Sequence, residues 1–362
     1  MKKKGLIAIV LCCLLLVVYI SRQKEQINNI NEIKIGAIIP LTGFSATNGV
    51  LFKQGLELAI NEINSDSSNI HFSVQIEDCK SSPKDAYTSF RKLDSQNIHF
   101  YAGFGGQFVL GFASDTKNTN KVLFASATPN TNLMSLTNRC FRLFPTAEMM
   151  TDRALNFIVE KGFEKIAIVY MQIDSYSMYY ELMQKKLKDA HKEIVFVESY
   201  DPNCRDFKNI VNKLAQANAD VVYSAGVGES SALFARQLFD TPNTKGIPII
   251  GDMNFSNPEN LKIIGSNTAS IYNIESYMDE EFSKKYSFTF NQSPNTYSVY
   301  GYVIPFLLKE AYQKLGKNAT SDDVFKFIRS NKFDTAAGEL FFDQKTGEPN
   351  LTLIVRTIEA KK

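Results

Sequence analysis

The sequence predicts an α/β protein of two doubly wound lobes with mainly parallel sheets. The first observation is the stretch 33–64, which has the pattern of a buried strand, a loop rich in small polar side chains and an amphipathic helix. The second is that strand and helix periodicities alternate from there to about residue 251. The third is that the alternation starts again after Phe144 without a long polar linker, which indicates two touching lobes of similar plan.

The first βα unit carries the clearest pattern. Apolar residues fill almost every position from 33 to 39, as in a strand covered on both faces, and Pro40 ends the strand. The helix after it has apolar residues at helical spacing up to Ile63. Open α/β sheets bind ligands beyond the carboxyl ends of their strands, so residues 41–49 are a candidate recognition loop. Their hydroxyl groups serve equally well as turn formers and helix caps.

The remaining elements follow from the same two periodicities. In the first lobe we expect strands at 71–77, 100–103, 122–125 and 140–144 and helices at 83–93 and 108–116. In the second lobe we expect helices at 149–161, 176–190, 205–217 and 230–239 and strands at 165–170, 193–198, 221–224 and 248–251. Ser82 and Pro83 form a typical helix start, a capping hydroxyl followed by proline at the first helical position.

The N-terminus, residues 1–22, is predicted to be a signal peptide or a membrane anchor. Lys2, Lys3 and Lys4 precede an uncharged run, 5–20, and no small-residue cleavage site follows it. The fifteen apolar or aromatic residues of this run span about 22 Å as a helix, short of the roughly 30 Å of a hydrocarbon core. A cleaved signal and a membrane tether through residues 5–20 both remain open, and both place the rest of the chain in the periplasm or another extracytoplasmic space.

Composition excludes several classes of function. The chain is 44% hydrophobic and 22% charged, as in an ordinary soluble globular protein. Beyond residue 22 it has 36 basic and 38 acidic residues, so its net charge is near −2 and nucleic-acid binding has no support. Three cysteines remain there, Cys79, Cys140 and Cys204, which allow at most one intrachain disulfide and no zinc site. The three histidines lie far apart in apolar segments, so we expect neither a metal nor a cofactor.

Enzyme motifs also fail. Residues 103–108, GFGGQF, begin like a dinucleotide-binding loop, but Phe108 stands where a third glycine belongs. The sequence contains no G-x-S-x-G nucleophile elbow, H-E-x-x-H pair or phosphate loop. We therefore expect that the protein is not an enzyme.

The chain beyond the N-terminal segment resembles the Leu/Ile/Val-binding type of solute-binding protein of ABC importers, which has the type I periplasmic binding protein fold. The resemblance rests on the order and spacing of IKIGAIIPLTG with GLELAINEIN, EDCKSSP, SATPNTNL, KIAIVYMQIDSY, ADVVYSAGVGES, YGYVIPFLLKEAYQKLG and GELFFDQKTGEPN. It implies three crossings between the lobes, near 145–149, 272–276 and 335–340. The implied lobes are 33–146 with 277–335, and 147–276 with 336–358.

The resemblance implies ligand-binding positions, several of which depart from the family pattern. Asn48 stands where an aromatic of the first loop covers the ligand, and Val227 where a second aromatic often lies. Gln107 stands where a hydroxyl meets the ligand carboxylate, although glycine N–H groups beside it suit an anion at a helix start. Asp252 is a substitute for the family's acidic partner of the ligand ammonium, whose own position falls near Met253. The full set of implied ligand-binding residues is Ser45, Asn48, Gly106, Gln107, Ala127, Thr128, Tyr176, Val227, Gly228 and Asp252.

Each of these residues also has a plain structural role open to it. Gln107 would cap its helix, Thr128 would turn the chain, Tyr176 would pack in a core and Asp252 would hydrogen-bond a loop. If they are ligand contacts, the missing aromatic cover and the displaced acid favour a small polar molecule over a branched aliphatic amino acid.

The resemblance therefore implies an extracytoplasmic protein that clamps an amino acid or a similar small polar molecule between two lobes. The clamp would deliver this small-molecule ligand to an ABC permease of the inner membrane. The alternative is a membrane-anchored sensor of the same fold that signals to a partner protein. Neither reading involves nucleic acid.

Overall fold

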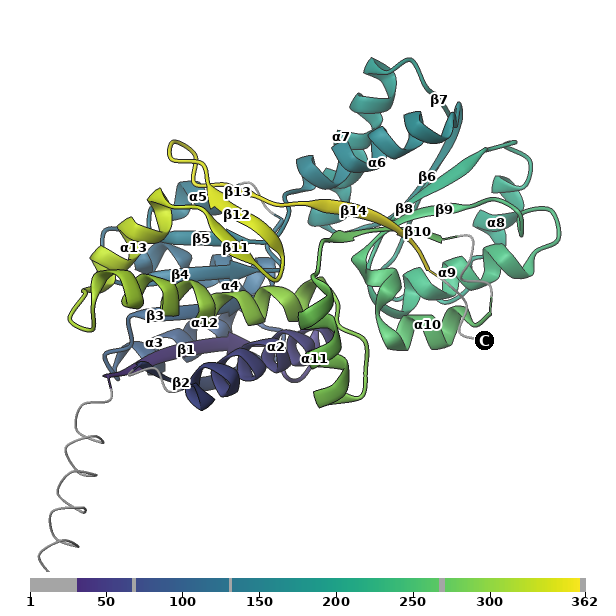
Figure 1. Cartoon of the computed structure of the whole chain (residues 1–362). Helices are drawn as coiled ribbons and strands as arrows, with labels where there is room; N and C mark the ends of the chain where they lie inside the picture. Colours follow the sequence, from purple (N-terminus) through teal and green to yellow (C-terminus); the bar gives the residue numbers. More distant parts are fainter. Residues whose placement is uncertain (1–30, 67–69, 130–131, 267–270, 359–362) are drawn as a thin grey trace, which may run out of the picture.

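The computed structural model describes residues 31–66, 70–129, 132–266 and 271–358. It confirms the predicted fold class, because two lobes of mixed α/β structure, each with a mostly parallel sheet, lie beside each other (Figure 1). The predicted signal or anchor, residues 1–22, lies outside the described residues. Within them no helix is long and apolar enough to cross a membrane.

The sheet of the first lobe has five strands in the order β2-β1-β3-β4-β5, and all neighbours are parallel. Its strands are β1 (Asn31–Ile39), β2 (Ile70–Asp78), β3 (Phe100–Phe104), β4 (Val122–Ser126) and β5 (Cys140–Leu143). Helices cover both faces, as the largely apolar run of β1 predicts. The first-lobe helices are α2 (Ala46–Ser65), α3 (Pro83–Asp94), α4 (Gly106–Ala113), η1 (Ser114–Thr116), α5 (Leu133–Leu136), α11 (Glu280–Phe290), α12 (Thr296–Leu315) and α13 (Ser321–Ser330).

The two faces of this sheet pack against different helices. Helices α2 and α12 share one core with β1 through residues such as Phe52 and Ile304, and α3 and α4 share a second core through Phe90 and Phe112. Helix α3 begins as predicted, with the Ser82 hydroxyl accepting a hydrogen bond from the Asp85 N–H at 3.3 Å.

The sheet of the second lobe has six strands in the order β14-β10-β9-β8-β6-β7. Its strands are β6 (Lys165–Met171), β7 (Glu193–Tyr200), β8 (Val221–Ala225), β9 (Ile249–Asp252), β10 (Ile271–Ser276) and β14 (Leu353–Thr357). Strand β14 is antiparallel to β10, and the other pairs are parallel. The helices of this lobe are α6 (Ala147–Lys161), α7 (Asp174–Asp189), α8 (Lys208–Leu214), α9 (Gly228–Asp240), η2 (Met253–Ser256) and α10 (Pro258–Ile264).

A small antiparallel sheet, which was not predicted, lies on the first lobe. Its strands are β11 (Phe333–Thr335), β12 (Gly338–Phe342) and β13 (Pro349–Asn350). The ring of Phe342 lies 4.7 Å from that of Phe141 on β5, and Glu348 forms an ion pair with Arg142. The structure thus differs from the expected division, in which residues 336–358 join the second lobe.

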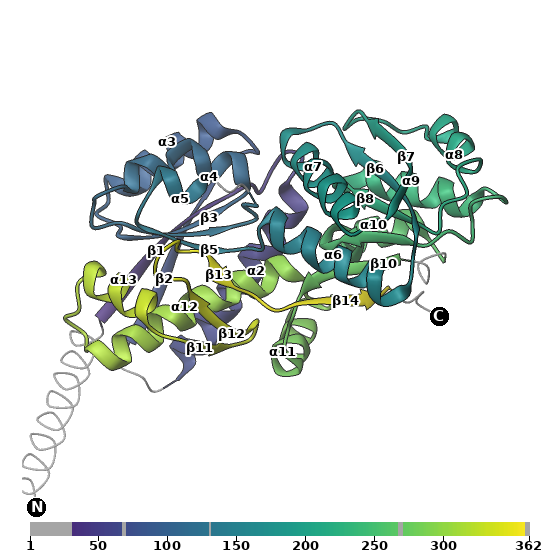
Figure 2. The same ribbon diagram turned by 90° about the horizontal axis from the view of Figure 1, so that it is seen from above.

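The chain passes between the lobes three times, as expected for this fold. The passages lie between β5 and α6, between β10 and α11, and between β13 and β14 (Figures 1 and 2). The last one, at residues 351–352, lies more than ten positions beyond the expected 335–340. The short strands β11 and β12 form a local hairpin against the first lobe and delay the passage.

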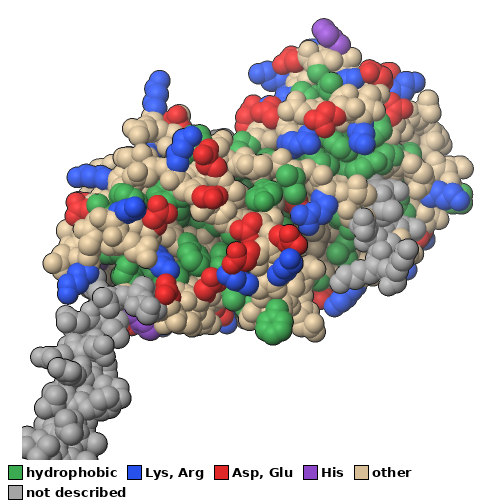
Figure 3. Space-filling model, in the orientation of Figure 1, with side chains coloured by type: hydrophobic (Ala, Val, Ile, Leu, Met, Phe, Trp, Pro, Cys, Tyr) green, Lys and Arg blue, Asp and Glu red, His purple; other side chains and the backbone are tan. Residues whose placement is uncertain are grey.

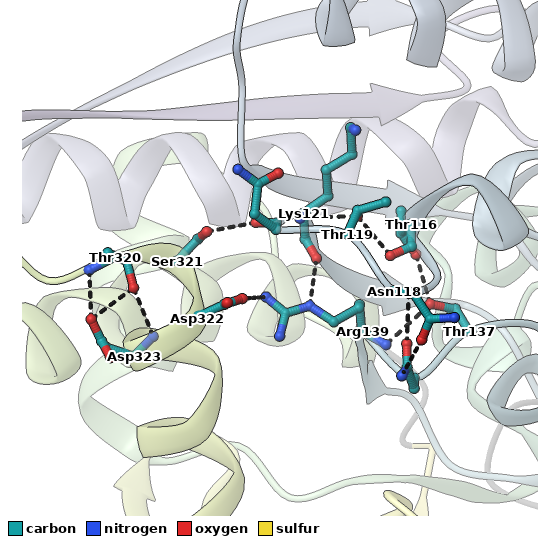
Figure 4. Close-up of polar contacts among 12 residues, drawn as sticks. Thr116, Asn118, Thr119, Lys121, Thr137, Arg139, Thr320, Ser321, Asp322 and Asp323 are labelled. Atoms are coloured by element: carbon teal, nitrogen blue, oxygen red, sulfur yellow. Dashed lines mark hydrogen bonds and ion pairs between the residues drawn. The ribbon is translucent and has the colours of Figure 1, made fainter.

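Over the face shown in Figure 3, Lys and Arg side chains are interspersed with Asp and Glu side chains. A polar cluster joins α13 to the amino-terminal ends of β4 and β5 (Figure 4). Arg139 pairs with Asp322 at 2.7 Å, and the Ser321 hydroxyl donates to the Asn120 carbonyl at 2.6 Å. This cluster fastens α13 to the first lobe.

The three cysteines that follow the N-terminal segment are free thiols. Cys79 and Cys140 are buried, and burial raises the thiol pKa of each, to about 11 for Cys79 and about 12 for Cys140. Such thiols are unreactive at neutral pH.

Candidate functional site

A cleft of about 1110 Å³ lies between the lobes, at the carboxyl ends of their parallel strands. This is where open α/β sheets place ligands. The wall residues of the first lobe lie within segments 44–48 and 104–110, together with Ala127, Pro129 and Phe144, and those of the second lobe lie within 171–179, 202–205, 227–233 and 252–254. Tyr297, from the start of α12, completes the wall.

Nine of the ten sequence-predicted ligand residues line this cleft. The exception is Thr128, whose side chain is fully buried and whose hydroxyl donates to the Ser126 carbonyl at 2.9 Å. The backbone carbonyl of Thr128 accepts a hydrogen bond from Arg142. The geometry therefore gives Thr128 the turn-forming role that the sequence left open, while the other nine remain predicted ligand contacts.

Phe44 is an aromatic side chain of the cleft that the sequence reasoning missed. It lies in the first loop, 78% exposed, with its ring 6.0 Å from that of Phe108. The resemblance placed the covering aromatic at position 48, four residues later. The available signal for Phe44 is an aromatic residue in a loop just before a helix, α2.

On the first-lobe side the cleft meets the start of α4. Gly105 is the N-cap, with a φ of 94° and no side chain to cap the helix, and the first turn has no acidic residue. Gly105, Gly106 and Gln107 all line the cleft. Helices α7 and α9 also start at the cleft, but their first turns contain Asp174 and Glu229. Helix α4 is therefore the start best suited to an anionic group.

On the second-lobe side the cleft meets a hydrogen-bonded cluster around Asp252, at the end of β9. Asp252 Oδ1 accepts from the Asn254 side-chain amide at 2.7 Å and from the Asn254 N–H at 3.0 Å. Asp252 Oδ2 lies 3.5 Å from the Tyr176 hydroxyl, which accepts from the Asn254 amide at 3.1 Å. Asn254 is the second residue that the sequence reasoning missed, because an asparagine beside a strand end has many local uses.

The Asp252 carboxyl has an altered acidity. Its desolvation raises its pKa from 3.8 to about 6, and the hydrogen bonds from Asn254 and Tyr176 oppose the rise. The carboxylate that forms above this pH is poorly solvated, which makes it a favourable partner for a cation.

Two hydrogen bonds cross between the lobes near the cleft. Asn257, at the start of α10, donates to Asn48 of α2 at 3.0 Å. The Tyr297 hydroxyl of α12 donates to the Asn254 side-chain carbonyl at 3.2 Å.

The remaining charges of the cleft lie at its rim. Arg205 pairs with Glu229 at 2.9 Å, and both side chains are more than half exposed. Solvent screening makes such a pair weak. In the ranges that the structure describes, no group of three or more His, Cys, Asp and Glu side chains is placed to hold a metal ion.

Comparisons with known proteins agree with this architecture. A family model described as periplasmic binding protein matches residues 32–362. The Leu/Ile/Val-binding protein homolog 1 of Brucella abortus is 26% identical over 342 residues, which cover 88% of each chain.

Two solved structures share the fold. The substrate-binding protein LivJ of Streptococcus pneumoniae, solved with isoleucine, has a TM-score of 0.81 and 18% identity over 91% of this chain and 96% of its own. A solute-binding protein of Rhodopseudomonas palustris BisB5, solved with 3,4-dihydroxybenzoic acid, has a TM-score of 0.81 and 19% identity over 91% and 93%. The chain belongs to the periplasmic binding protein family, an extracytoplasmic family of substrate-binding proteins and not of enzymes.

Proposed function

We propose that this protein captures an amino acid, or a similar small polar molecule with one anionic and one cationic group, and delivers it to an ABC permease. The observation that carries the proposal is the polarity of the cleft. The uncapped start of α4 lies on one side and the Asp252 carboxylate on the other. The N–H groups of Gly106 and Gln107 would hold the solute carboxylate, and Asp252 would hold its ammonium group.

The same polarity argues against a simple aromatic acid, the kind of solute named for the Rhodopseudomonas palustris structure. Such an acid has a carboxylate for α4 but no cation for Asp252. When the lobes close around it, the Asp252 carboxylate would be left desolvated and unpaired, or would have to take up a proton. A zwitterion satisfies both ends of the cleft.

Isoleucine, named for the LivJ structure, is a zwitterion with an apolar side chain. The amide side chains of Asn48, Gln107 and Gln172 line the present cleft and would lose hydrogen bonds to water against such a side chain. We therefore expect a polar amino acid to bind more tightly than leucine, isoleucine or valine.

Delivery to a permease would use closure of the lobes. A solute that contacts both lobes binds the closed form more tightly than the open form and shifts the population toward it. The permease would then recognise the closed shape. The anchored-sensor alternative is favoured by the uncharged run 5–20 without a small-residue cleavage site, and N-terminal sequencing of the exported protein separates the two.

The test is thermal unfolding of residues 23–362 with a panel of matched compounds. Each amino acid is paired with its α-hydroxy acid, which lacks the ammonium group, and with its amide, which lacks the carboxylate. A true solute at 100 times its Kd stabilises the fold by about 2.7 kcal/mol. We expect this shift from a polar amino acid and much smaller shifts from its two partners. Equal shifts from the amino acid and its hydroxy acid would refute the role of Asp252.

A further inference from the structure

The side chain of Asn254 contacts residues of both lobes. It is almost fully buried in the cleft wall, in η2, and its amide nitrogen donates to Asp252 and to Tyr176. Its carbonyl oxygen accepts from Tyr297 of the first lobe. A carboxylate only accepts hydrogen bonds, so the Asn254 nitrogen must face Asp252 and the carbonyl must face Tyr297. The chemistry of its neighbours thus fixes the orientation of the amide.

Tyr297 is itself firmly held. Its ring stacks on that of Phe144 at a centroid distance of 5.9 Å and an interplanar angle of 4°. It also makes an edge-to-face contact with the ring of Phe104, at a centroid distance of 5.4 Å. These two rings lie at the ends of β5 and β3, so the Tyr297 hydroxyl is a fixed point of the first lobe. Through this hydroxyl the first lobe holds a side chain of the second.

The orientation of Asn254 decides which oxygen of Asp252 is available. Both hydrogen bonds from Asn254 go to Oδ1, at 2.7 and 3.0 Å. Oδ2 has the longer contact of 3.5 Å with the Tyr176 hydroxyl and is the less engaged oxygen. Without the Asn254 amide, the Asp252 carboxylate would be free to rotate about its Cβ–Cγ bond, and Oδ1 and Oδ2 would no longer differ in their hydrogen bonding.

We infer that Asn254 is a positioning residue for solute binding: held by Tyr297 of the first lobe, it presents the Asp252 carboxylate and the Tyr176 hydroxyl of the second lobe to the cationic group of the solute. This inference rests on the proposed function, in which Asp252 meets that group. It adds a link between the two lobes, because the cation site is complete only when Tyr297 reaches Asn254.

The pKa of Asp252 can be measured without a ligand, and it depends on the groups around this carboxyl. The titratable side chains that interact with it are Tyr176 and Tyr179 of α7, Tyr200 of β7, Tyr223 of β8 and Tyr297 of α12. The pKa values of all five are raised, with burial as the main cause, so they stay neutral at physiological pH. The hydrogen bonds from Asn254 lower the pKa of Asp252, so loosening them must raise it further.

The first experiment follows the carboxyl carbon resonances of aspartate-labelled full-length protein against pH, with the Asp252 signal identified by its loss in Asp252→Asn. We expect Asn254→Leu to raise the pKa of Asp252 by about one unit or more and Tyr297→Phe to raise it by a smaller, measurable amount. Tyr302→Phe is the matched control, because it removes a hydroxyl of the same helix that bonds Glu62 within the first lobe. A titration of Tyr297→Phe that coincides with that of Tyr302→Phe would overturn the inference.

The second experiment measures the affinity of the same variants for the amino acids that stabilise the protein in the panel. We expect Asp252→Asn to bind at least tenfold more weakly, Tyr297→Phe several-fold more weakly and Tyr302→Phe as the wild type does. Unchanged affinity in Asp252→Asn would remove the cation site of the proposed function and the inference with it. Weaker binding in Asp252→Asn together with wild-type binding in Tyr297→Phe would overturn the positioning role alone.

Discussion

The first cleft loop is held by two side chains that do not line the cleft. Asp78, at the end of β2, accepts hydrogen bonds from the N–H groups of Leu41 and Lys80 at 2.9 and 2.8 Å and from the Thr42 hydroxyl at 2.7 Å. Ser81 donates to the Thr42 carbonyl and accepts from the Ser45 N–H. The conformation of the loop that contains Phe44 and Ser45 therefore depends on Asp78 and Ser81, which lie at and just after the end of the neighbouring strand β2.

Asp78→Asn should destabilise the protein at neutral pH by about 1–2 kcal/mol. The Asp78 carboxylate accepts hydrogen bonds at both of its oxygens, whereas an asparagine amide accepts them only at its single oxygen. Burial acts to raise the Asp78 pKa, but the hydrogen bonds from Lys80, Thr42 and Leu41 together hold it below the ordinary 3.8. The stabilisation is thus present above pH 3.8 and is lost as the pH falls through the lowered pKa. Urea unfolding at pH 7 and at pH 3 measures the difference. Glu280→Gln, which removes a fully exposed ion pair with Lys284, serves as the control. If Asp78→Asn lost the same free energy of unfolding at both pH values, this account would be contradicted.

The pKa of Asp252 is shifted in the opposite direction from that of Asp78. Its folded pKa of about 6 lies above the ordinary 3.8, so its contribution to ligand-free stability is present below pH 3.8 and is lost as the pH rises through 6. A bound ammonium group needs the ionised form. We expect amino acid affinity to be constant above about pH 7 and to fall about tenfold per pH unit well below 6. Calorimetric titration between pH 5 and 8 checks this, and Asp252→Asn should show weak binding without the slope.

Nine of the ten residues that sequence reasoning proposed for the ligand site line the cleft, but their hydrogen-bond and packing partners were not predicted. Asp252 and Tyr176 follow strands, and the carboxyl ends of parallel strands meet at one edge, so their presence in the cleft was predictable. The roles of Phe44 and Asn254 depend on tertiary neighbours, Phe108 for the first and Tyr297 for the second. No local pattern encodes a contact between residues more than forty positions apart.

At the scale of elements, the close crossing of α2 and α12 decides the packing of the first lobe. A Cβ atom at Gly55 would lie 1.9 Å from the Ser298 carbonyl oxygen, and one at Gly301 would lie 2.2 Å from that of Phe52. Both obstacles are backbone atoms, so a side chain there could be accommodated only if the helices moved apart. The glycines in GLEL and YGYV thus have a packing role as well as marking the resemblance.

Gly301→Ala should cost about 3 kcal/mol or more of the free energy of unfolding, at the upper end of overpacking effects, because helix backbones cannot yield as a side chain does. Gly246→Ala is the matched control, since a Cβ there meets nothing within 4 Å, and should change stability by less than about 0.5 kcal/mol. Denaturant unfolding of both variants measures the effect. Similar stabilities for the two would show that α2 and α12 separate easily.

Most strands of the two large sheets were predictable because they are short, largely apolar segments between helices; β10 and β14 were not among the predicted strands. The third sheet was not predictable, because β11 and β13 have three and two residues and pair antiparallel without a periodic signal. Its attachment depends on Arg142, a fully buried cation that pairs with Glu348 at 2.7 Å. That pairing spans about two hundred positions, beyond the reach of any local pattern.

At the scale of the whole molecule, the proposed function depends on the balance between open and closed lobes. The hydrogen bond from Asn257 to Asn48 joins α10 to α2 across the cleft. A bond of this kind contributes about 0.5–1.5 kcal/mol, enough to change a ratio of closed to open molecules about two- to tenfold. A protein with a partly populated closed form gains apparent affinity in proportion to that population.

Asn257→Ser tests this balance, because a serine hydroxyl can still cap α10 in place of the Asn257 oxygen that accepts from the Glu259 N–H, but it is too short to reach Asn48. We expect the solute-free variant to be more open, with a larger radius of gyration in solution scattering, and its affinity for the panel amino acids to fall about two- to tenfold through the loss of closed molecules. At saturating solute its scattering should coincide with that of the wild type, because the solute supplies the contacts that the bond had provided. Asn331→Ser makes the same chemical change at the exposed C-cap of α13, far from the cleft, and should alter neither measurement. Solute-free scattering of Asn257→Ser that matches the wild type would show that the bond follows lobe closure and does not contribute to it.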